Sequence, residues 1–243
     1  MEESEIKGGD KKISPIRFYG RRLGRVGSPT RQKLMDEVLS SFSINLETLK
    51  NQSLDDIGYL FEHSSPYQQF WLEIGCGGGE HMVALANNNP EHGFIAAEAF
   101  LPGIGKLIHQ MVEKKITNVR VFPEDIRQLF PYLPTGSLTG VILLFPDPWP
   151  KTAHANRRFV CPSNLEAIHR LLKENGEFLT ATDDENLARW TEKQLQTSPF
   201  FEIIDIKRQR PQHWHSTRYE SKALKQGKQP WYFTCRKKNL VLI

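Results

Sequence analysis

Short apolar runs alternate with amphipathic stretches from residue 70 onward. Apolar runs of this length predict buried strands, and stretches with a period of 3.6 predict helices. The strands are expected at residues 70–75, 93–98, 118–123, 140–145, 176–181, 201–206 and 231–236. The helices are expected at residues 80–88, 103–115, 164–174 and 184–196. Strands that alternate with helices predict an α/β fold with a parallel, doubly wound sheet.

The carboxyl ends of the strands are where such a sheet binds its ligands. The stretch that ends the first strand and begins the next helix contains Gly75, Gly77 and Gly79. Glycines let the backbone approach a ligand closely, next to the N–H groups of a helix start. A dinucleotide fingerprint requires a glycine where Glu80 stands, and the Glu80 charge would repel a pyrophosphate. With the acid Glu73 on the strand, the pattern suits a nucleoside without phosphates, such as S-adenosylmethionine; a strand–turn–helix without ligand is the alternative.

Acidic residues follow the second and third strands. Glu98 comes about 20 residues after the glycine turn, the spacing at which a carboxylate accepts from ribose hydroxyls. The alternative interpretation is that Glu98 is an ordinary surface acid without a ligand. Asp125 follows the third strand, where its carboxylate would accept from an adenine amine. A second interpretation makes Asp125 the N-cap of the short helix that follows.

A proline-rich loop after the fourth strand, Phe145–Lys151, is the most specific stretch of the chain. Three prolines restrict the backbone and prevent both a longer strand and a helix start. Asp147 is thereby held at the mouth of the cleft beside Trp149, an arrangement that suits a planar base. No regular element is expected before residue 164, and a loop this long is usually functional; a turn-rich surface loop is the alternative. Cations that would contact phosphate follow Trp149: Lys151, Arg157 and Arg158, with His154 among them.

Two further groups of polar residues stand near strand ends. Asp183 follows the fifth strand, where it would cap the helix of residues 184–196 and also touch substrate. The stretch from His215 to Glu220 precedes the last strand and offers a hydroxyl, a cation and a carboxylate. Spacing alone assigns these groups no role.

The part of the chain before residue 70 has a weaker pattern. Residues 1–13 are charged and nearly free of large apolar groups, which predicts disorder. The stretch from Arg17 to Arg25 interleaves arginines with aromatics and glycines, a composition that contacts phosphates and bases and folds on its partner. A helix is expected from Pro29 to Leu39 with Ser28 as its N-cap. Residues 40–69 are expected to be irregular.

The chain divides into a basic, flexible arm over residues 1–27 and one domain over residues 28–243. Its net charge of +4 is unevenly distributed. Residues 1–33 contain nine Lys and Arg against four acids, and residues 207–243 contain ten against Glu220 alone. The middle is therefore acidic, and two basic ends around it suggest a polyanionic partner. Solvated charged tails are the alternative.

The class of protein is further limited by composition. The chain is 39% hydrophobic, a globular value, and no apolar run approaches the length of about 20 residues that spans a membrane. The acidic N-terminus does not resemble a secretory signal. Cys76, Cys161 and Cys235 lie far apart, so neither disulfides nor a metal site is expected, and a cytoplasmic protein fits.

With these motifs the chain resembles the tRNA (guanine-N7-)-methyltransferase family of the bacterial single-chain type. The resemblance covers residues 17 to 236, and its marks are Leu72-Glu73-Ile74-Gly75-x-Gly77-x-Gly79, Phe145-Pro146-Asp147-Pro148-Trp149-x-Lys151, His154 with Arg157-Arg158, Ala181-Thr182-Asp183, and Thr217-x-x-Glu220. The glycine motif is common to many methyltransferases, whereas the Pro-Asp-Pro-Trp loop is far more discriminating. The fold implied is the Rossmann-like class I methyltransferase sheet with a reversed last strand.

The resemblance implies an enzyme that transfers a methyl group from S-adenosyl-L-methionine to N7 of a guanosine in the variable loop of tRNA. The glycines and four acids would bind the cofactor: Glu73, Glu98, Asp125 and Asp147. Asp147 is also the catalytic candidate. Residues implied in binding the RNA substrate are Lys151, His154, Arg157, Arg158, Asp183, Thr217, Arg218, Tyr219 and Glu220. No metal and no obligatory protein partner is expected, and the chain is expected to be a monomer or a homodimer.

This chain departs from the family pattern at two places. Asn156 and Ala153 stand where the family often has basic residues, which would shift RNA contact to Arg157 and Arg158. Ala96-Ala97 replaces a more usual pair before Glu98, and we expect this to be tolerated.

Two rival functions remain open. A methyltransferase of exocyclic amines usually has Asn/Asp-Pro-Pro-Tyr after the fourth strand, and Trp149 stands here in place of the second proline. An RNA-binding protein with a dead cofactor site is the other rival. The intact glycines, Glu73 and Glu98 argue against it.

Overall fold

A single seven-stranded sheet organises the chain in the computed structural model, which describes residues 19–20, 22–24, 29–51, 54–61, 67–212 and 214–240. The strands lie in the order β3-β2-β1-β4-β5-β7-β6. Their bounds are β1 Gln69–Ile74, β2 His92–Ala97, β3 Val119–Phe122, β4 Leu138–Leu144, β5 Leu172–Thr182, β6 Phe201–Lys207 and β7 Trp231–Lys237. β7 runs antiparallel to both of its neighbours, and the pairs β1–β2, β1–β4, β2–β3 and β4–β5 are parallel. The predicted α/β sheet with a reversed last strand is confirmed.

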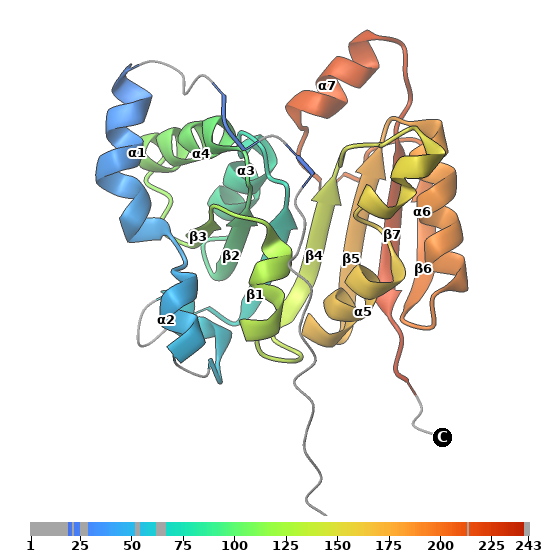
Figure 1. Cartoon of the computed structure of the whole chain (residues 1–243), viewed down its shortest axis with the longest axis horizontal. Helices are drawn as coiled ribbons and strands as arrows, with labels where there is room; N and C mark the ends of the chain where they lie inside the picture. Colours follow the sequence, from blue (N-terminus) through green and yellow to red (C-terminus); the bar gives the residue numbers. More distant parts are fainter. Residues whose placement is uncertain are drawn as a thin grey trace, which may run out of the picture.

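The helices cover the two faces of this sheet in two groups (Figure 1). Their bounds are α1 Pro29–Phe42, α2 Leu46–Asn51, α3 Glu80–Asn88, α4 Leu101–Glu113, α5 Pro162–Leu171, α6 Glu185–Thr197 and α7 Arg218–Lys225. On one face, α3 and α4 bury apolar residues such as Met82 and Leu107 against Phe94. On the other face, α5 and α6 bury residues such as Ile168 and Leu195 against the sheet. None of the described helices is long and apolar enough to span a membrane.

The region before β1 differs from the prediction. Residues 40–69 contain α2 and a 3₁₀ helix, Ile57–Phe61, and are therefore not wholly irregular. Ile57 and Phe61 are buried against the sheet, so tertiary packing stabilises a segment that has little periodicity of its own. Ser28, the predicted N-cap of α1, lies outside the described residues.

Two helix boundaries nearer the carboxyl terminus were also wrong, and two short helices there were not predicted. The helix predicted to end at 174 ends at Leu171, because Leu172 already pairs with Leu138 of β4. The long loop after β4 contains a 3₁₀ helix, Thr152–Arg157, and α5 starts at Pro162 rather than 164. The short helix α7 was not predicted, since its eight residues give too short a periodic signal.

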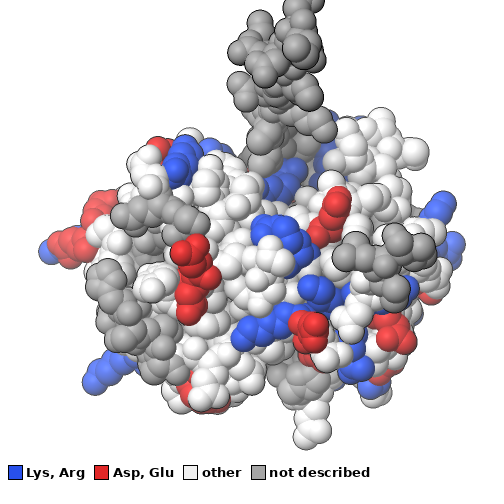
Figure 2. All heavy atoms as spheres, turned by 90° about the horizontal axis from the view of Figure 1, so that it is seen from below, with Lys and Arg blue, Asp and Glu red and all other residues white. Residues whose placement is uncertain are grey.

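The two edges of the sheet differ in what they present. The carboxyl ends of the parallel strands are overhung by α7, as Figure 1 shows, because β6 ends and β7 begins at this edge. Figure 2 views the molecule from below, where Lys and Arg are interspersed with Asp and Glu. A surface of mixed sign gives a polyanion no continuous attraction. The candidate site is therefore sought at the carboxyl edge.

Candidate active site

A tight loop follows β1 and carries the three predicted glycines. Gly75, Gly77 and Gly79 have φ angles of 70°, 58° and 81°, in the left-handed region that glycine adopts without strain. Apart from its two chain neighbours, no described residue has a heavy atom within 4 Å of the point where a side chain on Gly75 would begin. At Gly77 the one described contact of that point is the Tyr219 ring, at 3.8 Å. The loop therefore leaves open space above its backbone, as a cradle for a ligand requires.

Helix α4 holds this glycine loop from the side, which sequence reasoning missed. Gln110 of α4 donates from Nε2 to the Gly78 carbonyl at 2.7 Å. At Gly103 an added Cβ would lie 2.6 Å from the Gly77 carbonyl oxygen, so only glycine allows this close approach. The sequence signal was the pair Gly103 and Gly105 near a helix start, where glycine is otherwise unfavourable.

Glu98 lies directly after β2, as predicted, and its carboxyl group contacts the glycine loop. Its Oε2 accepts from the Gly77 N–H at 2.8 Å, and its Oε1 accepts from the Phe100 N–H at 2.8 Å. Burial raises the pKa of the Glu98 carboxyl, these N–H groups oppose the rise, and the nearby charge of Asp147 adds to it. Glu98 and Asp147 follow β2 and β4, on either side of β1, and the open space above Gly75 and Gly77 at this edge is what we call the glycine groove.

Glu73 lies below the groove, within the sheet, and only 2% of its surface is exposed. Its Oε2 lies 3.1 Å from Nδ1 of His81, the buried partner from α3 that the sequence did not reveal. Burial, together with Glu98, Glu73 and Glu80, raises the pKa of the Cys76 thiol well above its usual range. The thiol is therefore protonated, and the acidic side chains that surround it suit a cationic ligand.

Asp125 caps the 3₁₀ helix Ile126–Gln128, which confirms the second of the two interpretations offered for it. Its Oδ1 accepts from the Arg127 N–H at 3.0 Å, and the Arg127 guanidinium binds both carboxylate oxygens. A carboxylate has about four acceptor positions, and the backbone N–H and guanidinium of Arg127 occupy them, so a further donor would have to displace the guanidinium. Contact with an adenine edge stays a prediction.

The proline-rich loop leaves β4 with an unusual backbone. Phe145 and Trp149 have φ angles of 51° and 43°, a left-handed conformation that costs a residue other than glycine roughly 1–3 kcal/mol. The loop is fastened at its start, where the Phe145 N–H donates to the Ala181 carbonyl at 2.8 Å. Asp147 lies between the two strained residues and is exposed. Such strain, held by its surroundings, is typical of a functional loop.

The cations after this loop fall into two groups. Lys151 is exposed and Arg157 half-buried, whereas Arg158 is buried and donates from an Nη to the Trp149 carbonyl at 3.2 Å. Its guanidinium also lies over the Trp190 ring at 4.8 Å. Arg158 therefore differs from the expectation of a phosphate ligand, because its charge faces inward and supports the loop. Desolvation and the charges of Arg157 and Lys151 lower the pKa of His154.

The prediction that Asp183 caps α6 was wrong. The cap is Asp184, whose Oδ1 accepts from the Leu187 N–H at 2.8 Å. Asp183 is the residue before this cap, and Lys228 donates to its Oδ2 at 2.8 Å. The hydrogen bond and the charge of Asp183 raise the pKa of Lys228. The ion pair joins the end of β5 to the segment before β7.

Helix α7 is fixed to the sheet through Glu220, which is only 3% exposed. Thr217 caps the helix by accepting from the Glu220 N–H at 3.0 Å. The Glu220 carboxylate accepts from the Tyr232 hydroxyl at 2.5 Å and from Arg210 at 2.9 Å. Burial and the bond to Glu220 raise the pKa of the Tyr232 phenol, which keeps its donor proton. This arrangement places the exposed Tyr219 ring above Gly77.

Replacing Glu220 with alanine is expected to lower the free energy of unfolding by about 1–3 kcal/mol, because the Tyr232 hydroxyl is left buried without its acceptor. Urea denaturation followed by circular dichroism measures this change. Glu202→Ala is the control, since Glu202 is exposed on β6. Equal stability of the two variants would show that the buried network does not hold α7.

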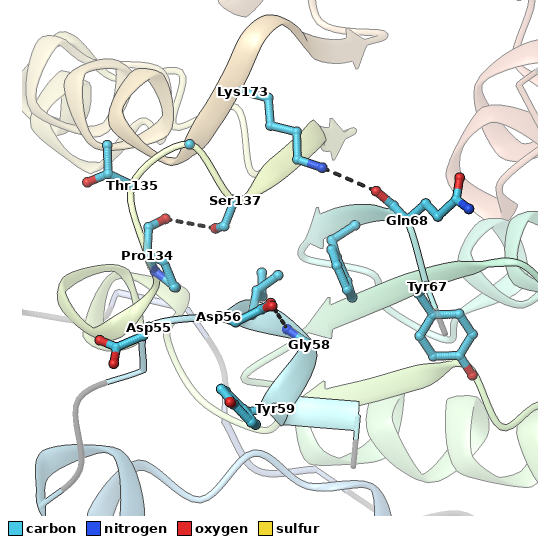
Figure 3. Close-up of a pocket in the computed structure, with 13 residues that line it drawn as sticks. Asp55, Asp56, Gly58, Tyr59, Tyr67, Gln68, Pro134, Thr135, Ser137 and Lys173 are labelled. Carbon is cyan, nitrogen blue, oxygen red and sulfur yellow. Dashed lines mark hydrogen bonds between the residues drawn. The ribbon is translucent and has the colours of Figure 1, made fainter. Parts of the chain in front are cut away.

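A cavity of about 550 Å³ lies far from these residues, at the amino edge of the sheet (Figure 3). Asp55, Tyr59 and Ser137 are among its lining residues. Lys173 donates to the Gln68 carbonyl at 3.2 Å, as Figure 3 shows. None of the predicted site residues lines this cavity. Ligands of doubly wound sheets bind at the opposite edge, so we assign the chemistry to the glycine groove.

Comparison with known proteins identifies the family. Over 234 residues the chain is 43% identical to the tRNA (guanine-N(7)-)-methyltransferase of Rhodospirillum rubrum, and the match covers 94% of this chain and 91% of that protein. The chain belongs to the tRNA (guanine-N7-)-methyltransferase family. A second relative of that name, from Paramagnetospirillum magneticum, is 39% identical and matches 91% of this chain and 93% of its own. A family model described as "Putative methyltransferase" matches residues 67–233.

The fold of this methyltransferase family member is shared by solved structures of low sequence identity. The 16S rRNA methyltransferase KamB superposes with a TM-score of 0.57 at 15% identity, covering 72% of this chain and 90% of that one. An antibiotic-related methyltransferase superposes with a TM-score of 0.52 at 17% identity, covering 81% of this chain and 95% of that one. These likenesses establish the class I methyltransferase fold.

Proposed function

We propose that the chain transfers a methyl group from S-adenosyl-L-methionine to N7 of a guanosine in the variable loop of tRNA. The observation that carries the proposal is the juxtaposition, at one edge of the sheet, of an open glycine loop beside the Glu98 carboxyl group and a strained Pro-Asp-Pro-Trp loop. The first requirement of the reaction is a place for a cationic nucleoside, and the second is a fixed site for a base. The names of the relatives support the same substrate.

The residues of the groove fit the cofactor. The open space above Gly75 and Gly77 admits a ligand close to the backbone. Glu98 accepts from the backbone N–H groups of Gly77, Phe100 and Ala99, which leaves about one of its four acceptor positions for the ribose hydroxyls. Glu73, behind the loop, adds negative charge and sets the orientation of His81. Bound there, S-adenosyl-L-methionine supplies an electrophilic methyl group on a positively charged sulfur.

The chain's own contribution to the reaction is orientation. Guanine N7 carries an in-plane lone pair and no proton at neutral pH, so it attacks the methyl carbon without a general base. Holding the nucleophile in line with the methyl group is worth roughly 7–11 kcal/mol of the barrier. We assign Asp147 to bind the guanine N1–H and exocyclic amine, and Asp183 to assist it once Lys228 has moved aside. Neither carboxylate removes a proton.

The RNA is held by cations around this groove. Lys151 and Arg157 are accessible to phosphate, and Arg158 contributes by supporting the Trp149 backbone. On α7, the residues Arg218, Lys222 and Lys225 lie at positions i, i+4 and i+7 and are exposed; we call them the α7 basic stripe. Thr217 and Glu220 fix this helix, with Tyr219 above the groove. We propose that the basic arm of residues 1–27 adds further contacts, and that the protein acts in the cytoplasm.

Replacing Glu98 with alanine is expected to raise the dissociation constant of S-adenosyl-L-methionine by about 10- to 100-fold, the effect of losing hydrogen bonds to a charged group. Isothermal titration calorimetry with the cofactor alone measures it. Glu91→Ala, an exposed acid at the amino edge, is the matched control. An unchanged affinity in Glu98→Ala would remove this carboxylate from the cofactor site.

The function itself is tested with the wild-type chain, methyl-labelled cofactor and tRNA lacking modifications. We expect label in 7-methylguanosine after nuclease digestion, at one position of the variable loop. Label on an exocyclic amine would instead support the rival methyltransferase. Cofactor and tRNA binding without any transfer would support an inactive RNA-binding protein.

A further inference from the structure

Tyr19, from the segment before α1, packs on the predicted RNA-contacting residues. The Arg157 guanidinium lies over the Tyr19 ring at 4.7 Å and over the Trp149 ring at 5.0 Å. The two rings meet edge to face, with their centres 6.4 Å apart. A cation held over two aromatic faces is attracted by both ring quadrupoles. The Arg157 side chain is therefore fixed by one aromatic from the proline-rich loop and one from the N-terminal segment.

The same segment is fastened at a second point. The Arg22 carbonyl accepts from the Leu101 N–H, at the start of α4, at 3.1 Å. The Arg22 side chain lies 4.0 Å from Glu124, which follows β3. These contacts with the domain differ from the expectation that the stretch from Arg17 to Arg25 folds only on its partner. The described pieces of this segment lie above the sheet between α4 and α7 (Figure 1).

The two fastening points lie on opposite sides of the glycine loop. Leu101 follows β2, and Trp149 follows β4, with β1 between these strands. The described residues of the segment therefore contact the domain on both the β2 side and the β4 side of the glycine loop.

We propose that Tyr19 is a positioning residue for RNA binding that acts through Arg157, presenting its guanidinium to a phosphate of the substrate. The role rests on the proposed function, since the phosphate belongs to the tRNA. An arginine side chain has many rotamers, and a guanidinium that is already held loses less conformational entropy on binding. The Tyr19 ring and the Trp149 ring together restrain the Arg157 guanidinium.

A double-mutant cycle tests this role. Tyr19→Ala is expected to raise the Kd for unmodified tRNA about 5-fold, a typical loss for one exposed cation–π contact with its ordering effect. In an Arg157→Ala background, Tyr19→Ala should have no further effect, because the residue through which it acts is gone. Tyr19→Phe keeps the ring and should restore the wild-type Kd. Tyr59→Ala, an exposed tyrosine at the amino edge, should change nothing.

The kinetic pattern separates this role from a general structural one. We expect the KM for tRNA to rise in Tyr19→Ala, with kcat at saturating tRNA and cofactor affinity unchanged. Additive effects of Tyr19→Ala and Arg157→Ala, or a Tyr19→Phe variant as weak as Tyr19→Ala, would overturn the proposal. Methylation of tRNA by the wild-type chain is measured separately. If the wild-type chain does not methylate tRNA, the proposed function fails. The double-mutant cycle on tRNA binding still decides whether Tyr19 acts through Arg157.

Discussion

Replacing Asp147 with alanine is expected to lower kcat for tRNA methylation by about 100-fold or more, the usual cost of misplacing a reacting group by about 1 Å. Asp147 lies between Phe145 and Trp149, whose left-handed backbone fixes the direction of its side chain. Without the carboxylate, the guanine ring loses the acceptor that aligns N7. Steady-state kinetics with unmodified tRNA at saturating cofactor measures the effect.

The fold is expected to survive this change, because the Asp147 side chain is exposed and the Arg158–Trp149 bond that supports the loop is retained. An unchanged melting temperature serves as the check. Asp147→Asn keeps the shape and one acceptor oxygen, so its kcat should lie between those of alanine and wild type. Wild-type turnover in Asp147→Ala would remove this residue from the reaction.

The architecture of this chain could be predicted from the sequence because each strand is a short apolar run bounded by glycine, proline or polar residues. The glycine loop, Glu98 and the proline-rich loop follow strands β1, β2 and β4, and parallel strands bring such ends together. Local sequence therefore determined both what these residues are and where they lie. The order of strands and helices along the chain was therefore enough to predict where the groove lies.

Contacts between segments distant in sequence could not be predicted. His81 beside Glu73, Gln110 on the glycine loop and Lys228 on Asp183 depend on how helices dock, which periodicity does not encode. The Asp183 cap was wrong by one residue, the usual uncertainty of a helix end. Arg158 was taken for a phosphate ligand because its charge, and not its burial, is visible in the sequence.

Replacing the α7 basic stripe, as Arg218→Gln, Lys222→Gln and Lys225→Gln together, is expected to flatten the salt dependence of tRNA binding. Each phosphate contact contributes about 0.7–0.9 to the slope of log Kobs against log salt, so three contacts contribute roughly 2–3. The opposite face of α7 carries the buried Glu220 and Ala223, so the helix should remain docked. Tyr219 above Gly77 would keep the stripe next to the groove in the wild-type enzyme.

The control neutralises three exposed lysines elsewhere, Lys114, Lys115 and Lys193. Lys114 and Lys115 follow α4 at the amino edge, and Lys193 lies beyond the middle of α6, which runs toward that edge. Both triple variants lose three positive charges, so a general effect of net charge would flatten both plots equally. A site-specific effect flattens only the α7 variant. Parallel plots for the α7 variant and wild type would exclude this helix from the RNA interface, and the salt dependence would then have to come from the arm and the proline-rich loop.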